Sequence, residues 1–91
     1  MHKSDLAKKV AEKTGLSHKD AEAAVDTAFD LITDALAAGE KVVITGFGTF
    51  ERKVRKARTG RHPSTNAVIN IPEKRAASFS AGKLLKEKVE T

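Results

Sequence analysis

The sequence predicts an α+β fold: a helical hairpin, a short antiparallel β-sheet with a protruding basic β-ribbon arm, and a C-terminal helix. Three observations support it. Apolar residues recur at helical spacing through residues 4–39, β-branched segments separated by turn residues follow, and a capped apolar segment closes the chain. We expect one domain over residues 1–91, divided into the hairpin (1–40), body sheet (41–51 and 76–80), arm (52–75) and last helix (81–91).

Two helices are predicted in the first 40 residues. Ser4 is the expected N-cap of the first, which ends at Thr14-Gly15, because Ser caps helix starts and Gly helix ends. Ser17 is the expected N-cap of the second, which closes at Gly39. The apolar stripes comprise Leu6 and Val10 in the first helix and Ala21, Val25, Ala28, Phe29, Ile32 and Leu36 in the second.

A strand over residues 41–44 precedes the tight reversal Gly46-Phe47-Gly48. Neither a helix nor a third glycine follows this GxG, which argues against a dinucleotide-type phosphate loop. We interpret Phe29, Phe47, Phe50 and Phe79 as core residues. The alternative for an exposed aromatic side chain is stacking on a nucleic-acid base.

The segment from Arg52 to Arg75 concentrates the positive charge. Eight basic residues against one acid, Glu73, give +7 over 24 residues, whereas the whole chain is +5 and the remainder is therefore −2. Every arginine of the chain lies in this segment. Arginine is suited to bidentate phosphate contact and to insertion into a narrow groove, so the segment predicts a nucleic-acid contact.

Two strands joined by a turn are predicted inside this segment. Residues 49–58 read as the outgoing strand and Val68–Ile71 as the return, with Pro63 fixing one dihedral angle and Asn66 able to adopt a positive φ. An isolated two-stranded ribbon is marginal in water. We therefore expect the arm to become ordered on a partner.

After the arm, Ser80 is the expected N-cap of a last helix that ends near Val89, with Leu84 and Leu85 on its apolar side. Outside the arm, the 91-residue chain has few residues with which to form the hydrophobic core of a stable monomer, and aromatic residues make up only 4% of the chain. A second copy sharing the core would remedy this, so we expect a homodimer.

Three stretches resemble the bacterial histone-like HU/IHF family: Gly46 to Phe50, Arg58 to Pro63, and Ser80 to Lys83. The resemblance implies an intertwined homodimer with the phenylalanines in its shared interior. It also implies bending of duplex DNA from the minor groove. HU and IHF are standard examples of proteins that kink DNA with apolar wedges. This chain departs from the family pattern at His62, Asn66 and Ala67, where Asn, Gly and a polar residue are usual.

Pro63 is the implied wedge, while Lys3 and Lys83 are implied to flank the path of the bent DNA. The predicted DNA-binding residues are Arg52, Lys53, Arg55, Lys56, Arg58, Arg61, His62, Pro63, Asn66, Lys74, Arg75, Lys3 and Lys83. The degenerate minor-groove code predicts little sequence preference, with bent, nicked or junction DNA favoured.

The second helix carries an acidic stripe: Glu22, Asp26, Asp30 and Asp34. One interpretation is a solvated face partly paired with lysines of the first helix. A second is a surface that repels DNA and so directs the arms towards it. A third interpretation is a divalent-metal site. Its affinity would be weak, because monodentate carboxylates on an open helix face hold a metal ion poorly.

Other classes of function find little support in the sequence. His2, His18 and His62 are scattered, and the chain has no cysteine, so we predict no enzymatic activity, no cofactor and no metal site. No apolar leader or membrane-length segment is present, and we expect a cytoplasmic, nucleoid-associated protein without membrane contact. Two alternatives stay open: a sequence-preferring IHF-like bending factor and a general nucleic-acid binder that also takes RNA.

Overall fold

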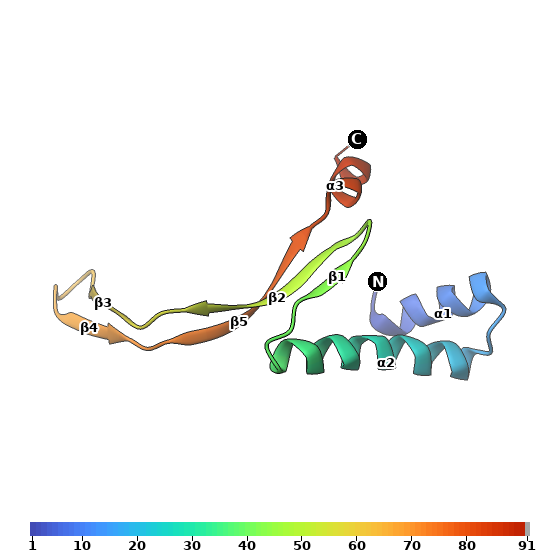
Figure 1. Ribbon diagram of the computed structural model, residues 1–91, viewed down its shortest axis with the longest axis horizontal. Helices are drawn as coiled ribbons and strands as arrows, with labels where there is room; N and C mark the ends of the chain where they lie inside the picture. Colours follow the sequence, from blue (N-terminus) through green and yellow to red (C-terminus); the bar gives the residue numbers. More distant parts are fainter. Residues whose placement is uncertain (91) are drawn as a thin grey trace. The chain divides into compact units, whose positions relative to one another are not determined.

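The computed structural model describes residues 1–90 and divides into two compact units, Met1–Ala35 and the chain from Leu36 onward. The elements are α1 (Lys3–Thr14), α2 (His18–Ala37), β1 (Val42–Ile44), β2 (Gly48–Arg55), β3 (Arg58–Arg61), β4 (Val68–Ile71), β5 (Lys74–Ala81) and α3 (Lys83–Val89) (Figure 1). Helices followed by antiparallel strands and a last helix confirm the predicted α+β class. The finer domain boundaries stay predictions.

The ends of α1 and α2 are capped by local hydrogen bonds. Gly15 has φ 76° and its N–H donates to the Ala11 carbonyl, and the Asp20 N–H donates to Ser17 Oγ at 3.1 Å, as predicted for both caps. The prediction of Ser4 as the first N-cap is wrong. The cap is His2, whose backbone N–H donates to Asp5 Oδ2 at 2.9 Å, so the helix begins at Lys3, before the predicted cap.

Small side chains form the buried part of the first unit. Ala7 and Ala21 are almost completely buried and Val25 is 9% exposed. Leu6, predicted on the buried stripe, is 36% exposed and Phe29 is 44% exposed. The helical pattern therefore identifies an apolar face that a single chain covers only in part.

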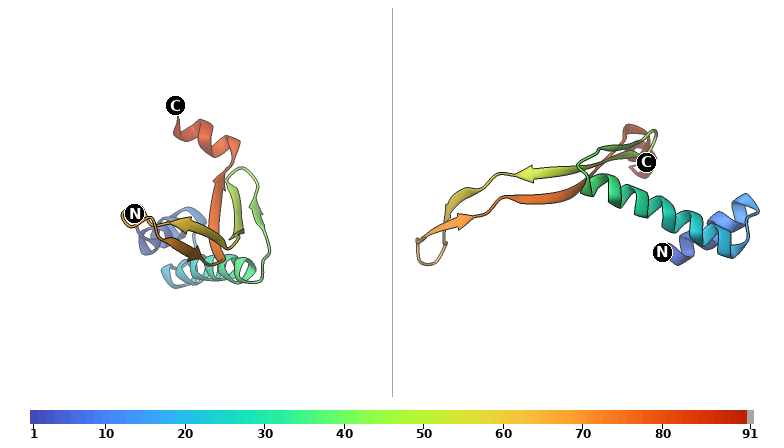
Figure 2. Two further views of the ribbon diagram at one scale, coloured as in Figure 1. Left: turned by 90° about the vertical axis from the view of Figure 1, so that its left-hand side faces the viewer. Right: turned by 60° about the horizontal axis from the view of Figure 1, so that its bottom comes forward.

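The body sheet and the arm are built from antiparallel ladders (Figures 1 and 2). The body sheet has strand order β1-β2-β5, and β2 pairs with β5 without interruption from Gly48 opposite Ala81 to Arg55 opposite Lys74. The second ladder pairs β3 with β4, from Arg58 opposite Ile71 to Arg61 opposite Val68. Pro72 lies in the gap between them, where its missing N–H cannot complete a ladder.

Phenylalanines pack around the reversal that precedes β2. The ring centroid of Phe79 lies 5.4 Å from that of Phe47 and 4.7 Å from that of Phe50. Gly46 has φ 83°, as the turn requires, whereas Gly48 is needed for space. A Cβ atom on Gly48 would lie 2.5 Å from the Phe79 ring and 2.6 Å from the Ser80 carbonyl oxygen.

The last helix begins later than predicted. Ser80 is still paired with Thr49 in the sheet, so the prediction that it caps α3 is wrong, and Gly82 is the N-cap. The Gly82 N–H donates to the Phe47 carbonyl at 2.8 Å. That bond joins the start of α3 to the glycine-rich turn, within the same unit.

Candidate nucleic-acid interface

The arm presents an exposed cationic surface. Seven of its basic side chains are exposed: Lys53, Arg55, Lys56, Arg58, Arg61, Lys74 and Arg75. Of these, Lys53 alone forms an ion pair within the described residues, with Glu51 at a distance of 4.0 Å between Nζ and Oε1. The charge of the arm is therefore left largely without compensation inside the chain.

Positive charges even face one another across the ribbon. Arg55 is directly opposite Lys74 in the β2–β5 register, and like charges in that position destabilise a sheet. A hollow of about 410 Å³ at the joint between the ladders is lined by Arg55, Lys56, Arg58, Ile71, Pro72 and Lys74. Such a surface is suited to an anion that approaches from outside.

The arm ends in a turn that is closed by backbone hydrogen bonds. The His62 N–H donates to the Ala67 carbonyl at 2.8 Å, and the Asn66 N–H donates to the His62 carbonyl at 2.9 Å. Asn66 has φ 58°, which confirms the prediction of a positive φ at that residue. Pro63 lies in this turn and is exposed.

Arg52 differs from the other basic residues of the predicted site. Its side chain is half-buried, and Nη1 donates to the Ala37 carbonyl at 3.1 Å. That carbonyl belongs to the last residue of α2, where cations are favoured by the helix dipole. A role in DNA binding remains a prediction for Arg52, whereas its contact in the structure is with a helix end.

Sequence reasoning missed this contact, although a signal was available. Side chains alternate across a strand, so Arg52 lies on the same face of β2 as Phe50. The final carbonyls of a helix need donors from elsewhere. Together these rules point to Arg52, the arginine that lies two residues after Phe50.

The two lysines of the predicted site that lie outside the arm, Lys3 and Lys83, belong to different units. Lys3 Nζ is 2.9 Å from Asp26 Oδ1, and the hydrogen bond that it donates to that carboxylate, together with the carboxylate's charge, raises the pKa of Lys3 above its usual 10.5. Lys83 is 87% exposed and its Nζ lies 3.9 Å from Glu87 Oε1. Contact of either lysine with phosphate stays a prediction.

The acidic stripe of α2 is partly paired. Lys3 pairs with Asp26 as described, and His18 Nδ1 lies 3.9 Å from Glu22 Oε2. Pairing with a lysine of the first helix supports the interpretation of the stripe as a solvated face. Within residues 1–90, no three His, Cys, Asp or Glu side chains are grouped to hold a metal ion. The helices of this described region also lack the length and apolar character needed to cross a membrane.

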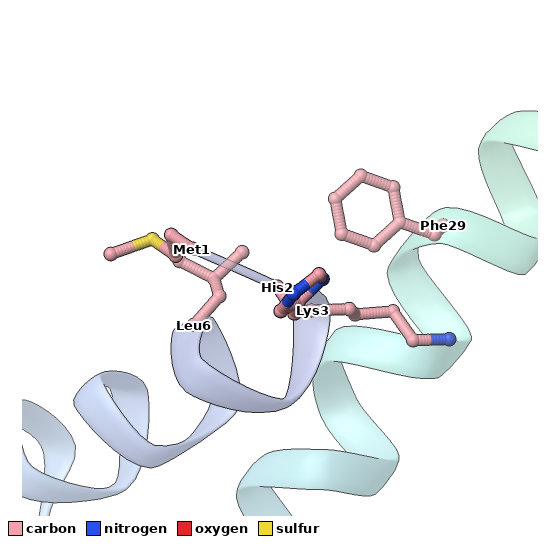
Figure 3. Close-up of a pocket in the computed structure, with 5 residues that line it drawn as sticks. All are labelled: Met1, His2, Lys3, Leu6 and Phe29. Carbon is pink, nitrogen blue, oxygen red and sulfur yellow. The ribbon is translucent and has the colours of Figure 1, made fainter.

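Apolar surface is extensive for so small a chain. Phe47 and Phe79 are 44% and 42% exposed, while the buried apolar residues of the described chain are Ala7, Ala21 and Val25 alone. In the first unit, Met1, His2, Lys3, Leu6 and Phe29 line an apolar hollow of about 380 Å³ (Figure 3). Large exposed apolar patches usually mark an interface.

Known proteins are similar to this chain over nearly its whole length. A family model described as bacterial DNA-binding protein matches residues 1–90. A DNA-binding protein HU from Nostoc is 47% identical, over 98% of this chain and 95% of its own. One from Geobacillus stearothermophilus is 49% identical, over 98% of this chain and 99% of its own.

Solved structures are similar as well. An Anabaena HU–DNA cocrystal structure has a TM-score of 0.84 and 47% identity, covering 98% of this chain and 97% of that chain. HU from Thermotoga maritima has a TM-score of 0.68 and 38% identity, covering 98% of each chain.

Proposed function

The chain belongs to the bacterial DNA-binding protein family, and we propose that it is an architectural protein that binds duplex DNA with little sequence preference and holds it bent. The observation that carries this proposal is the exposed ribbon on which Arg55 faces Lys74 and on which Lys53 alone, within the described residues, has an acidic partner. Its relatives include HU proteins, one of them in a cocrystal with DNA. The proposed function is binding without catalysis, on nucleoid DNA in the cytoplasm.

We propose that the functional unit is a homodimer. The exposed phenylalanines and the hollow beside Phe29 are the support, because an isolated chain would leave this apolar area in water. Two copies would bury it and present two arms. The shared interior is proposed to contain Phe29, Phe47, Phe50 and Phe79.

In the proposed mechanism, each arm follows the minor groove. Arg55, Arg58 and Arg61 would contact phosphates and the groove, which accepts guanidinium groups where it is narrow. Pro63 would insert its apolar ring between base pairs, because it lies at the exposed tip. Unstacking costs a few kcal/mol per step, which the additional phosphate contacts of a bent duplex offset.

A salt titration tests the electrostatic part. If a dimer neutralises roughly 6–10 phosphates, log K should fall against log salt with a slope of about −5 to −9. A slope near zero would contradict binding through the arm. Competition with structured RNA belongs to the same series, because equal affinity for RNA would favour a general nucleic-acid binder.

A bending assay tests the architectural part. We expect dye-labelled DNA to bend on binding, and nicked or four-way-junction DNA to compete better than linear duplex. Pro63→Ala should reduce the bend and the preference for distorted DNA while much non-specific affinity remains, because the charges of the arm are unchanged. High affinity for one site over random DNA would indicate a sequence-preferring factor instead.

A further inference from the structure

The imidazole of His62 is built into the turn at the arm tip. Its Nδ1 atom accepts hydrogen bonds from the Ser64 N–H at 3.2 Å and from the Thr65 N–H at 3.4 Å. A ring nitrogen that accepts carries no proton, so this arrangement requires the neutral tautomer with hydrogen on Nε2. His62 thus contributes its N–H, its carbonyl and its side chain to one turn.

Pro63 depends on that turn for its orientation. It lies between His62 and Ser64, has no N–H of its own, and is exposed like every residue from Arg61 to Asn70. Packing therefore does not hold the proline ring. The hydrogen bonds that span it run from the Ser64 and Thr65 N–H groups back to the imidazole and from the Asn66 N–H back to the His62 carbonyl, and together they limit its direction.

We propose that His62 is the positioning residue of the Pro63 wedge, and that it acts only while its imidazole is neutral. This inference rests on the proposed bending of DNA by the arm. Protonation of Nδ1 removes the acceptor of both imidazole hydrogen bonds and leaves the turn around the proline to its backbone bonds alone. Bending of the DNA then decreases as the pH is lowered, although the arm gains positive charge.

Among the described residues, the groups around the imidazole offer no negatively charged partner for a protonated ring. Arg61, on β3, precedes His62 in the chain, and its Nη1 donates to the Asn66 carbonyl oxygen in the same turn at 3.5 Å. Neither the turn residues Pro63–Ala67 nor β4 contains an ionisable side chain. A proton on His62 therefore meets a like charge in the free protein and phosphates only in the complex.

Nitrogen NMR on the free protein tests the tautomer. We expect the His62 signals at about pH 8 to show a bare Nδ1 and a protonated Nε2. A proton on Nδ1 at that pH would overturn the inference. This measurement needs no DNA, so its outcome is separate from that of the proposed function.

Bending of a nicked duplex by energy transfer tests the consequence at about pH 8 and about pH 5.5, between which an imidazole changes charge. The wild type should lose bending at the lower pH, while its affinity for linear duplex is kept or increased. His62→Ala should lose bending at both pH values. Its preference for nicked over linear DNA should fall by about fivefold for each hydrogen bond that is lost.

His62→Asn is the rescue variant, because its amide oxygen accepts the same backbone bonds without titrating in this range. It should bend DNA equally at both pH values. His18→Asn is the control for the loss of a histidine outside the arm, and it should bend DNA as the wild type does at both pH values. Unchanged bending by His62→Ala, or the same pH dependence in His62→Asn as in the wild type, would overturn the inference. Absence of bending by the wild type at pH 8 would instead overturn the proposed function.

Discussion

Replacing Arg52 by Met should separate a structural arginine from a DNA-binding one. Met keeps most of the aliphatic stem and removes the guanidinium that donates to the Ala37 carbonyl at 3.1 Å. A charged donor to a helix end contributes about 1 kcal/mol when half-exposed. For a chain of this size, that loss lowers the thermal midpoint by about 4–8 °C.

Arg58→Met is the matched control, because Arg58 is exposed and forms no ion pair within the described residues. In the proposed dimer, we expect its loss to remove two phosphate contacts and to flatten the salt slope by about 1.8. Between about 50 and 200 mM salt, this changes the salt dependence of the affinity by roughly tenfold. Thermal stability should hardly change.

The two variants are compared by thermal unfolding and by DNA titration at several salt concentrations. Arg52→Met should lower the thermal midpoint and keep the wild-type salt slope, whereas Arg58→Met should do the reverse. An Arg52→Met protein with normal stability and a slope flatter by about 1.8 would refute the reasoning. Arg52 would then be a phosphate contact, as the sequence prediction has it.

Three further changes test other parts of the structure. Gly48→Ala should destabilise the protein by about 1–3 kcal/mol in urea unfolding, because the new Cβ would meet the Phe79 ring and a backbone carbonyl on the neighbouring strand; a change below about 0.5 kcal/mol would contradict that crowding. Phe47→Ala should shift the protein from the proposed dimer to monomer in light scattering, since it removes an exposed aromatic side chain from the proposed shared interior; an intact dimer would argue against that interior. The Asp26 carboxylate raises the pKa of Lys3, so the stability from this pair is complete below pH 10.5 and is lost as pH rises through the raised pKa. Lys3→Met should therefore unfold at a lower temperature than the wild type at about pH 8, and the difference should disappear in strong alkali.

Local rules predict much of this fold because they act over a few residues. Gly15 and Asn66 take the positive φ that their places at a helix end and in a turn require. The errors arise where a longer-range contact competes with a local preference. Ser80 is a good cap by type, yet its pairing with Thr49 keeps it in the sheet.

The candidate site is predictable to a similar extent. The concentration of arginine reveals the basic arm without any knowledge of the fold, because the charge of a segment does not depend on where its strands begin and end. Composition cannot tell that Arg52 turns towards a helix carbonyl or that the His62 imidazole is an acceptor in its own turn. Both facts depend on atoms brought together by the folded backbone.

The break between the two ladders has a mechanical consequence. Lys56 and Ala57 on one side, and Pro72 and Glu73 on the other, belong to neither ladder. We expect the outer part of each arm to rotate about these four residues without the loss of a ladder hydrogen bond. In the proposed dimer, this rotation would let the arm tips reach duplexes of differing curvature.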